Sequence, residues 1–490
     1  MTRALVVTDV RPVDLATGTI DPRTCLRIRD GVITDRGDLT PGPDEELLDG
    51  AGGYALPGLW DRHVHLDTWA SMAARLDLYD TSSEEEVLDA VAQHLVTADP
   101  SAAVIAMGYR SSSWDHVPLT SALDAVAGDR PVALISGDGH NGWLSSAALR
   151  MLDLDPARHP TALHEDEWFP VLGSIGELEP AEVLDARVRQ ALRDAASLGV
   201  TGVVDMEFGD APQRWARRGI TGVRVRAAVY PTDLRGAIAE GRSTGTPFGP
   251  LAHQGPLKII SDGSLGTLTA HCCQPYVTPA GDRRLLAHPC GLQNVPADEL
   301  AGLLASARQH GLEVAVHAIG DAAVDIALDA FEATGAVGGI EHAQLISAGA
   351  ASRMAALGVE ASVQPAHLLD DATTMDRVWA DRTDRAFALR ALLDEGVVLA
   401  LGSDAPVAPL NPWRAIDAAV DRGPTAWHPE QAITRREALL ASTDGVSTLA
   451  PGGPGDLVIV DDDPLRASPA GAVRSTVCAG TTTHRQENAA

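Results

Sequence analysis

Short apolar runs alternate with amphipathic stretches through the middle of the chain. Four stretches rich in Ala, Leu, Arg and Glu have the composition of helices, at residues 181–198, 297–310, 322–334 and 385–393. Eight runs have the length and residue types of strands, at residues 55–65, 202–206, 223–230, 257–261, 313–317, 339–342, 360–364 and 397–402. Such alternation predicts a parallel sheet with helical crossovers. Eight strands are the number that closes a TIM (β/α)₈ barrel.

The two ends of the chain have a different pattern. Residues 1–54 consist of short β-type runs broken by turn residues, with Asp30-Gly31 as a hairpin signal. Residues 441–490 look alike, for example in Asp456-Leu-Val-Ile-Val-Asp461. Chain termini often lie close together, so we expect both ends to form one small β-sandwich domain. The barrel then spans 55–440, and residues from about 70 to 180, which break the alternation, form an insertion after the first barrel strand.

Composition narrows the class of protein. The 490 residues are 45% hydrophobic and 21% charged, as in ordinary folded proteins. The net charge of −29, with no Lys/Arg cluster, argues against a nucleic-acid partner. No apolar run is long enough to span a bilayer, and the first residues do not read as a signal peptide, so we expect a cytoplasmic protein with no membrane partner. The five cysteines match no disulfide or zinc-finger framework.

Candidate chemistry gathers at the ends of the predicted strands. His63 and His65 are two residues apart, so on a strand they share one face. Further candidates lie near the ends of later strands. Each of them alone has a simpler explanation: Lys258 could be a snorkelling side chain, and Asp404 could cap a helix. Together they mark five separate strand ends, where barrels of this type carry their active sites. Converging His, Lys and Asp side chains suit a cation such as zinc, and the candidate ligands are His63, His65, Lys258, His317, His342 and Asp404.

Several strings contain these residues: Pro57-Gly-Leu-Trp-Asp-Arg-His63-Val-His65, Lys258-Ile-Ile-Ser-Asp-Gly263, His317-Ala-Ile-Gly-Asp321, Glu341-His342 and Gly402-Ser-Asp404-Ala-Pro406. On these strings, the chain resembles the amidohydrolase superfamily, in the YtcJ-like branch that includes N-substituted formamide deformylases. The resemblance runs from about residue 50 to residue 465. Its motifs are specific to the branch and do not specify a substrate.

The resemblance implies a metal-dependent hydrolase that cleaves an amide- or formamide-type C–N bond in a small-molecule substrate. It implies one or two divalent metals, with zinc expected, and an N6-carboxylated Lys258 that bridges them. His63 and His65 would bind the more buried metal, and His317 and His342 the second. Asp404 would ligate the first metal and handle the proton of the attacking water. A homodimer is common on this fold, and the sequence leaves the oligomeric state open.

Further residues surround this set. Glu341, Asp262 and Asp321 could orient ligands, although Asp-Gly and Gly-Asp pairs are mostly turn chemistry. For contact with the substrate, the candidates are His140 and Trp143 in the insertion and Gln364 and His367 after the seventh strand.

Three alternatives stay open. A cyclic-imide or lactone hydrolase could use the same metal centre. A mononuclear deaminase of the same superfamily is less favoured. The nucleobase enzymes of that kind tend to carry a glutamate shortly after the strand-five histidine, where this chain has His317-Ala-Ile-Gly-Asp321. A catalytically silent binding protein is least favoured, because it need not keep a complete ligand set.

Overall fold

The computed structural model describes residues 4–73, 75–100, 102–109, 111, 114, 116–136, 141–178, 181–209, 211–219, 222–277, 288–469 and 473–486. The chain divides into two compact units. One consists of Met1–Leu66 with Ala191–Ala490, and the other is Asp67–Gln190.

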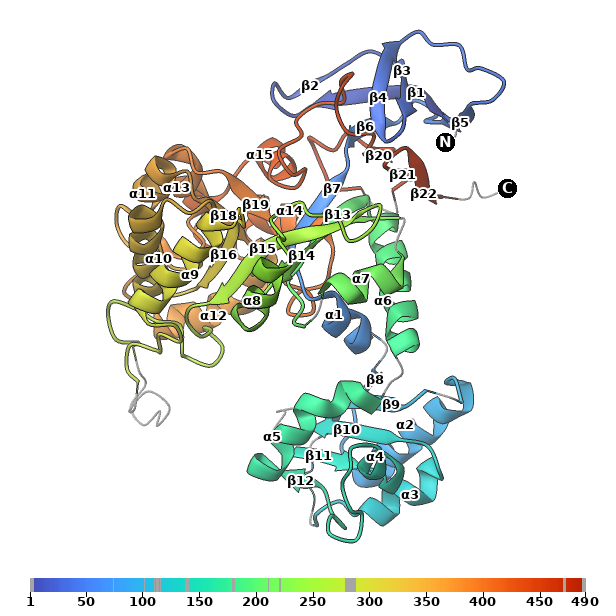
Figure 1. Ribbon diagram of the computed structural model, residues 1–490, viewed down its shortest axis with the longest axis vertical. Coiled ribbons are helices and arrows are strands. Elements are labelled where there is room, and N and C mark those ends of the chain that lie inside the picture. The colour runs from blue at the N-terminus through green and yellow to red at the C-terminus, as the bar shows by residue number, and fades with distance from the viewer. Residues whose placement is uncertain are drawn as a thin grey trace. The chain divides into compact units, whose positions relative to one another are not determined.

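The larger unit contains a barrel of eight parallel strands (Figure 1). In sheet order they are β7 (Leu59–Val64), β13 (Val200–Asp205), β14 (Arg224–Val229), β15 (Ala252–Ile260), β16 (Val314–Ala318), β17 (Gly338–His342), β18 (Glu360–Val363) and β19 (Leu399–Leu401). A parallel bridge between Val64 and Ala405 brings β7 beside the segment that follows β19. These are the eight predicted strands, so the barrel prediction is confirmed.

Helices follow most of the strands and cover the barrel. They include α8 (Pro231–Ala239), α9 (Ala297–Gln309), α10 (Asp321–Thr334), α11 (Ala350–Leu357), α13 (Leu389–Asp394) and α14 (Pro412–Asp421). One hydrophobic core lies between strands and helices, where Ile340 of β17 and Phe331 of α10 are both fully buried. The helix predicted at 385–393 starts too early, because Phe387 has a φ of 44° that a right-handed helix does not allow.

The predicted strand at 55–65 is in fact two strands. β6 (Tyr54–Pro57) pairs antiparallel with β20 (Leu457–Val460), whereas β7 belongs to the barrel. Gly58 lies between them, and a Cβ added there would be 2.1 Å from Thr201 Oγ1. The chain therefore passes from one sheet to the other at a glycine that has no room for a side chain.

Both chain ends form a nine-stranded sheet. Its other members are β1 (Leu5–Asp14), β2 (Thr19–Ile20), β3 (Thr24–Arg29), β4 (Val32–Gly37), β5 (Glu46–Asp49), β21 (Ser475–Cys478) and β22 (Thr481–Arg485). Asp30 and Gly31 have positive φ and form the predicted hairpin turn between β3 and β4. Leu26 from the first part of the chain and Ile459 from the last share one buried cluster, so the two ends fold around a common core.

The smaller unit has its own sheet and its own core. In order the strands are β12 (Leu163–His164), β11 (Asn141–Leu144), β10 (Val132–Ser136), β9 (Val104–Tyr109) and β8 (Leu76–Asp77). Leu134 faces a cluster shared with α2 (Glu84–Thr97) and α3 (Thr120–Ala127). Its neighbour Ile135 faces a second cluster shared with α4 (Ser146–Met151) and α5 (Glu165–Ser174). Alternate residues of one strand thus bury both faces of this sheet.

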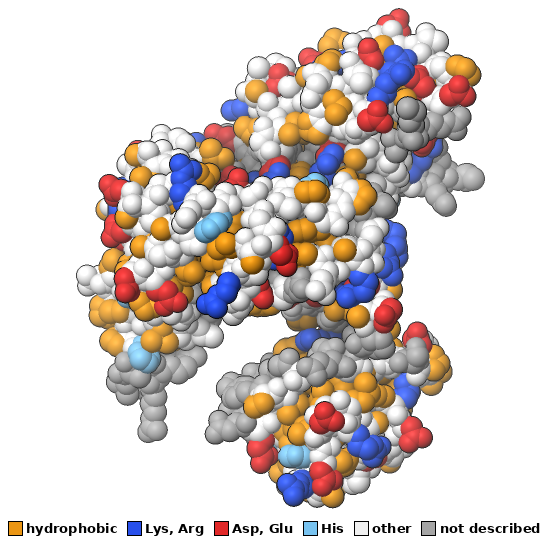
Figure 2. Space-filling model, in the orientation of Figure 1, with side chains coloured by type: hydrophobic (Ala, Val, Ile, Leu, Met, Phe, Trp, Pro, Cys, Tyr) orange, Lys and Arg blue, Asp and Glu red, His pale blue; other side chains and the backbone are white. Residues whose placement is uncertain are grey.

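Charged side chains of both signs are interspersed with apolar ones on the face shown in Figure 2. Among the helices in the described parts of the chain, none combines the length and the apolar character needed to cross a membrane.

Candidate metal centre

The six predicted ligands lie together at the C-terminal ends of the barrel strands. His63 comes from β7, His317 from β16 and His342 from β17, while Asp404 follows β19. His63 Nε2 is 3.3 Å from Lys258 Nζ and 3.4 Å from Asp404 Oδ1. Asp404 Oδ1 is also 3.5 Å from His65 Nε2, and the rings of His317 and His342 have centroids 4.6 Å apart. Every predicted ligand therefore contacts at least one other.

Three of these residues form a compact donor group. One ligand atom from each of His63, His342 and Asp404 lies within 4.8 Å of the other two. Burial lowers the pKa of His63, lowers that of His317 to about 3, and takes that of His342 well below its ordinary value. The imidazoles are thus neutral, as metal ligands must be.

Asp404, unlike these neutral imidazoles, carries a charge. Burial raises its pKa, but the surrounding imidazoles, His63 foremost, outweigh burial and hold that pKa well below its usual range. The carboxylate is therefore ionised. Neutral imidazoles around a carboxylate are a donor set that fits a divalent cation such as zinc.

Glu341 contacts the side of the His63 ring that faces away from Lys258 and Asp404. Its Oε2 lies 2.6 Å from His63 Nδ1. Burial raises the pKa of Glu341, but His63 and Lys258 outweigh burial and keep it lowered, so the ionised carboxylate accepts the Nδ1–H bond. This bond fixes the tautomer and leaves the lone pair of Nε2 directed at Lys258 and Asp404.

Lys258 is 2% exposed, and burial lowers its pKa. It is also the only lysine among the 38 lysine and arginine residues of the chain. Arginine serves at every other basic position, whereas this buried one keeps a primary amine. That contrast was visible in the composition, and it singles out Lys258 more sharply than its place in an apolar strand.

Asp262 contacts the neighbouring candidate ligand His317. Its carboxylate accepts backbone N–H bonds from His271, Ile319 and Gly320, at 2.9, 3.1 and 3.0 Å. Burial raises its pKa to about 7, although these bonds oppose the rise. Asp262 Oδ1 is 3.4 Å from His317 Nε2. Because that nitrogen also faces the Gly263 carbonyl at 3.1 Å, Nδ1 is the atom that His317 can offer to a cation.

Asp321 lies at the start of α10 and accepts a hydrogen bond from the Cys273 backbone at 2.7 Å. It also pairs with Arg385 at 3.2 Å. These contacts connect three segments of chain, and they account for Asp321 as a structural residue.

The residues predicted to contact substrate have different positions. Gln364 Nε2 is 3.4 Å from His63 Nδ1, and His367 Nε2 is 3.2 Å from the Ser403 carbonyl and 3.9 Å from Asp404 Oδ2. Trp143 is fully buried within the smaller unit, where its indole donates to the Leu119 carbonyl at 2.9 Å, so a packing role accounts for it. His140 lies outside the described residues.

Sequence reasoning missed Asp61 as a functional candidate. It is 3% exposed, and its Oδ1 accepts backbone N–H bonds from His63 and Ser403, each at 3.0 Å. Asp61 thus joins the strand that carries His63 to the segment that carries Asp404. The signal was available, because Asp61 lies two residues before His63 and shares its side of the strand.

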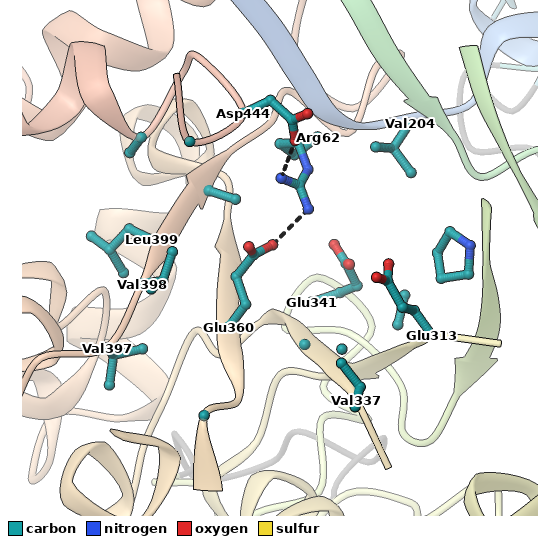
Figure 3. A pocket seen from close by; sticks show the side chains of 18 of the residues that line it. Arg62, Val204, Glu313, Val337, Glu341, Glu360, Val397, Val398, Leu399 and Asp444 are labelled. Carbon is teal, nitrogen blue, oxygen red and sulfur yellow. Dashed lines mark hydrogen bonds and ion pairs between the residues drawn. The ribbon is translucent and has the colours of Figure 1, made fainter. Parts of the chain in front are cut away.

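A large pocket lies at the other end of the barrel (Figure 3). Its volume is about 930 Å³, and it is lined by the first residues of β16 to β19. Figure 3 shows Arg62 between Asp444 and Glu360, 2.7 Å from each, with the Glu341 carboxylate facing the same space. Glu341 both lines this pocket and contacts His63 of the candidate metal centre.

The chain matches the model of the amidohydrolase family over residues 46–484. It belongs to the amidohydrolase family. It is 29% identical to the Arabidopsis thaliana protein LONG AFTER FAR-RED 3, over 87% of this chain and 81% of that one. It is 26% identical to a Bacillus subtilis (strain 168) protein called YtcJ, over 92% and 93%. It is 25% identical to the N-substituted formamide deformylase of Arthrobacter pascens, over 86% of each.

Among solved structures, an uncharacterized metal-dependent hydrolase from Pyrococcus horikoshii OT3 superposes with a TM-score of 0.82. The two sequences are 26% identical, and the superposition covers 96% of this amidohydrolase and 99% of the Pyrococcus chain. The expected YtcJ-like branch of the amidohydrolases is thereby confirmed, and the protein is a hydrolase of a metal-dependent family.

Proposed function

We propose that the protein hydrolyses an amide- or formamide-type C–N bond with a metal-activated water. The single observation that carries the proposal is the compact donor group of His63, His342 and Asp404, surrounded by His65, His317 and Lys258. The resemblance to a formamide deformylase favours this bond type among those that amidohydrolases cleave.

These residues would hold zinc or a similar cation, which when bound would lower the pKa of a water and polarise the substrate carbonyl. Asp404 is ionised and faces His63, His65 and His367, so it can accept the proton of the attacking water. It then returns that proton to the departing nitrogen. The products are a carboxylic acid, formic acid in the case of a formamide, and an amine.

Lys258 serves this reaction best as a carbamate. A protonated amine 3.3 Å from His63 Nε2 would repel a cation bound at that nitrogen. Reaction of the neutral amine with carbon dioxide releases one proton and gives a carboxylate-like group with two oxygens. That group would supply ligands to the His63 side and to the His317–His342 side of the centre.

The test measures metal content and turnover on the same preparations. We expect about two zinc equivalents in the wild type and a loss of metal in Lys258→Ala, because two carbamate oxygens would join the two sites. Since Lys258 is the only lysine, ¹³C-bicarbonate should produce one lysine carbamate signal by NMR, distinct from that of the α-amino group and absent from the variant. One zinc equivalent unchanged by the substitution, with no carbamate signal, would overturn the bridging role.

Asp404→Asn tests the proton transfer. We expect turnover of N-formyl and N-acyl amines to fall by about 10²–10⁴-fold, because an amide cannot accept the water's proton. Glu360→Gln is the control, since Glu360 is a partly buried carboxylate in the pocket at the other end of the barrel. Near wild-type turnover in Asp404→Asn with metal still bound would contradict the mechanism.

A further inference from the structure

Asp404, the candidate proton acceptor, has an uncommon backbone conformation. Its φ of 54° lies in the left-handed region, which residues other than glycine seldom adopt, although aspartate tolerates it better than most. Its carboxylate faces two histidines at once, with Oδ1 3.4 Å from His63 Nε2 and 3.5 Å from His65 Nε2. A conformation of this kind persists only where surrounding contacts hold it. The contacts on both sides of Asp404 therefore decide where its carboxylate lies.

The backbone of this turn is bonded to the strand end that carries both histidines. The Asp404 N–H donates to the His63 carbonyl at 2.7 Å, and the His65 N–H donates to the Ala405 carbonyl at 2.9 Å. These two bonds fix where the turn meets the end of β7. Neither of them uses an atom of the peptide group between Asp404 and Ala405, so the orientation of that peptide depends on other contacts.

Ser403 supplies such a contact. Its hydroxyl accepts the N–H of Ala405 at 3.1 Å and thereby spans Asp404. The remaining polar groups of Ser403 are bonded as well, because its N–H donates to Asp61 Oδ1 at 3.0 Å and its carbonyl accepts from His367 Nε2 at 3.2 Å. Ser403 is 2% exposed and Ala405 is 0% exposed, so water does not reach the bond between them.

We infer that Ser403 is a positioning residue for the reaction, because its hydroxyl holds the left-handed turn that directs the Asp404 carboxylate at His63 and His65. The inference rests on the proposed function and adds a residue that acts through Asp404. Without the hydroxyl, the buried N–H of Ala405 has no acceptor, which is unfavourable enough for the turn to rearrange. The carboxylate then moves away from the two histidines.

Ser403→Ala and Ser403→Thr test this role on the N-formyl and N-acyl amines. Ser403→Ala should lower kcat by about 10–100-fold, because misplacing a reacting group by about 1 Å has an effect of this size. KM should stay unchanged, since Ser403 acts through Asp404 and not on the substrate. Ser403→Thr keeps a hydroxyl on the same carbon and should restore kcat. The visible absorption spectrum of Co²⁺ bound in place of zinc should change in Ser403→Ala and not in Ser403→Thr.

Ser145→Ala is the matched control for the loss of a buried hydroxyl. Ser145 is fully buried in the smaller unit, and its hydroxyl also accepts backbone N–H bonds, from Val132 at 3.0 Å and from Ala148 at 3.2 Å. This substitution should lower stability and leave kcat and the cobalt spectrum unchanged. A kcat and a cobalt spectrum in Ser403→Ala equal to those of the wild type would overturn the inference, as would equal losses in Ser403→Ala and Ser403→Thr.

Hydrogen exchange of the metal-free full chain, followed by mass spectrometry, decides the inference without metal or turnover. Peptides that contain Ala405 should exchange at least about tenfold faster in Ser403→Ala than in the wild type, because the amide loses its acceptor. The same peptides should exchange at the wild-type rate in Ser145→Ala. Unchanged exchange in Ser403→Ala overturns the inference. If exchange rises as expected but the metal-loaded wild type hydrolyses no amide, the hydrolase proposal fails and the hold of Ser403 on Asp404 is supported separately.

Discussion

The Glu341 side chain determines which nitrogen of His63 is free to bind a cation. Its carboxylate accepts the Nδ1–H bond of His63 at 2.6 Å, which leaves Nε2 as the atom that His63 can offer to a cation. The same side chain forms a wall of the pocket at the far end of the barrel. The position directly before His342 drew attention to Glu341, but only the fold shows that its partner is His63, 278 residues away in sequence.

At the residue scale we predict that Glu341→Ala weakens zinc binding by about 10–100-fold, because His63 loses the group that orients it. Glu341→Gln should lose less, since its amide oxygen can still accept the Nδ1–H bond. Competition with a chromophoric chelator measures the affinity. Glu360→Ala is the matched control, as it removes another carboxylate of the same pocket. An affinity in Glu341→Ala equal to that of the control would rule out the orienting role.

At the element scale, Gly58 separates the terminal sheet from the barrel. A Cβ there would lie 2.1 Å from Thr201 Oγ1 and 2.5 Å from Thr201 Cγ2. All of the nearest atoms belong to one side chain of β13, so the passage from β6 to β7 depends on close contact with that strand. The continuous apolar run at 55–65 concealed this passage, because periodicity cannot tell which sheet a strand joins.

We predict that Gly58→Ala lowers the free energy of unfolding by about 1–3 kcal/mol, since the new methyl group overpacks this contact. Thr201→Ala in the same chain should restore part of the loss, which a double-mutant cycle in denaturant would measure. Gly302→Ala, in α9 with nothing within 4 Å of the added Cβ, should be neutral or stabilising by about 0.5–1 kcal/mol. A Gly58→Ala loss that Thr201→Ala does not reduce would refute the contact.

At the scale of the whole molecule, the candidate ligands come from only one of the two compact units. They lie on β7, β15, β16, β17 and after β19, so a bound cation would connect strands up to 341 positions apart, from His63 to Asp404. The smaller unit has two apolar clusters of its own. Its stability should therefore not depend on the metal.

Calorimetry of the full chain tests this division. Zinc at 100 times its Kd should stabilise the larger unit by about 2.7 kcal/mol, because the cation binds the folded barrel only. We expect a chelator to lower the melting temperature of one transition and leave the other in place. Asp404→Ala should reduce the response to zinc. A chelator that moves both transitions equally would show that the units unfold together.

The order of residues alone was sufficient for the eight barrel strands, the joint sheet of the two chain ends and the convergence of the six candidate side chains. Each depends on information carried locally: strand-length apolar runs, turn residues, and reactive side chains at strand ends. Contacts between distant segments decided the remainder. They split the strand at Gly58, buried Trp143 in a core and joined Asp61 to Ser403. A local pattern specifies how a segment is built, whereas the partner of an individual side chain is set only when the barrel closes and brings strands from across the chain together.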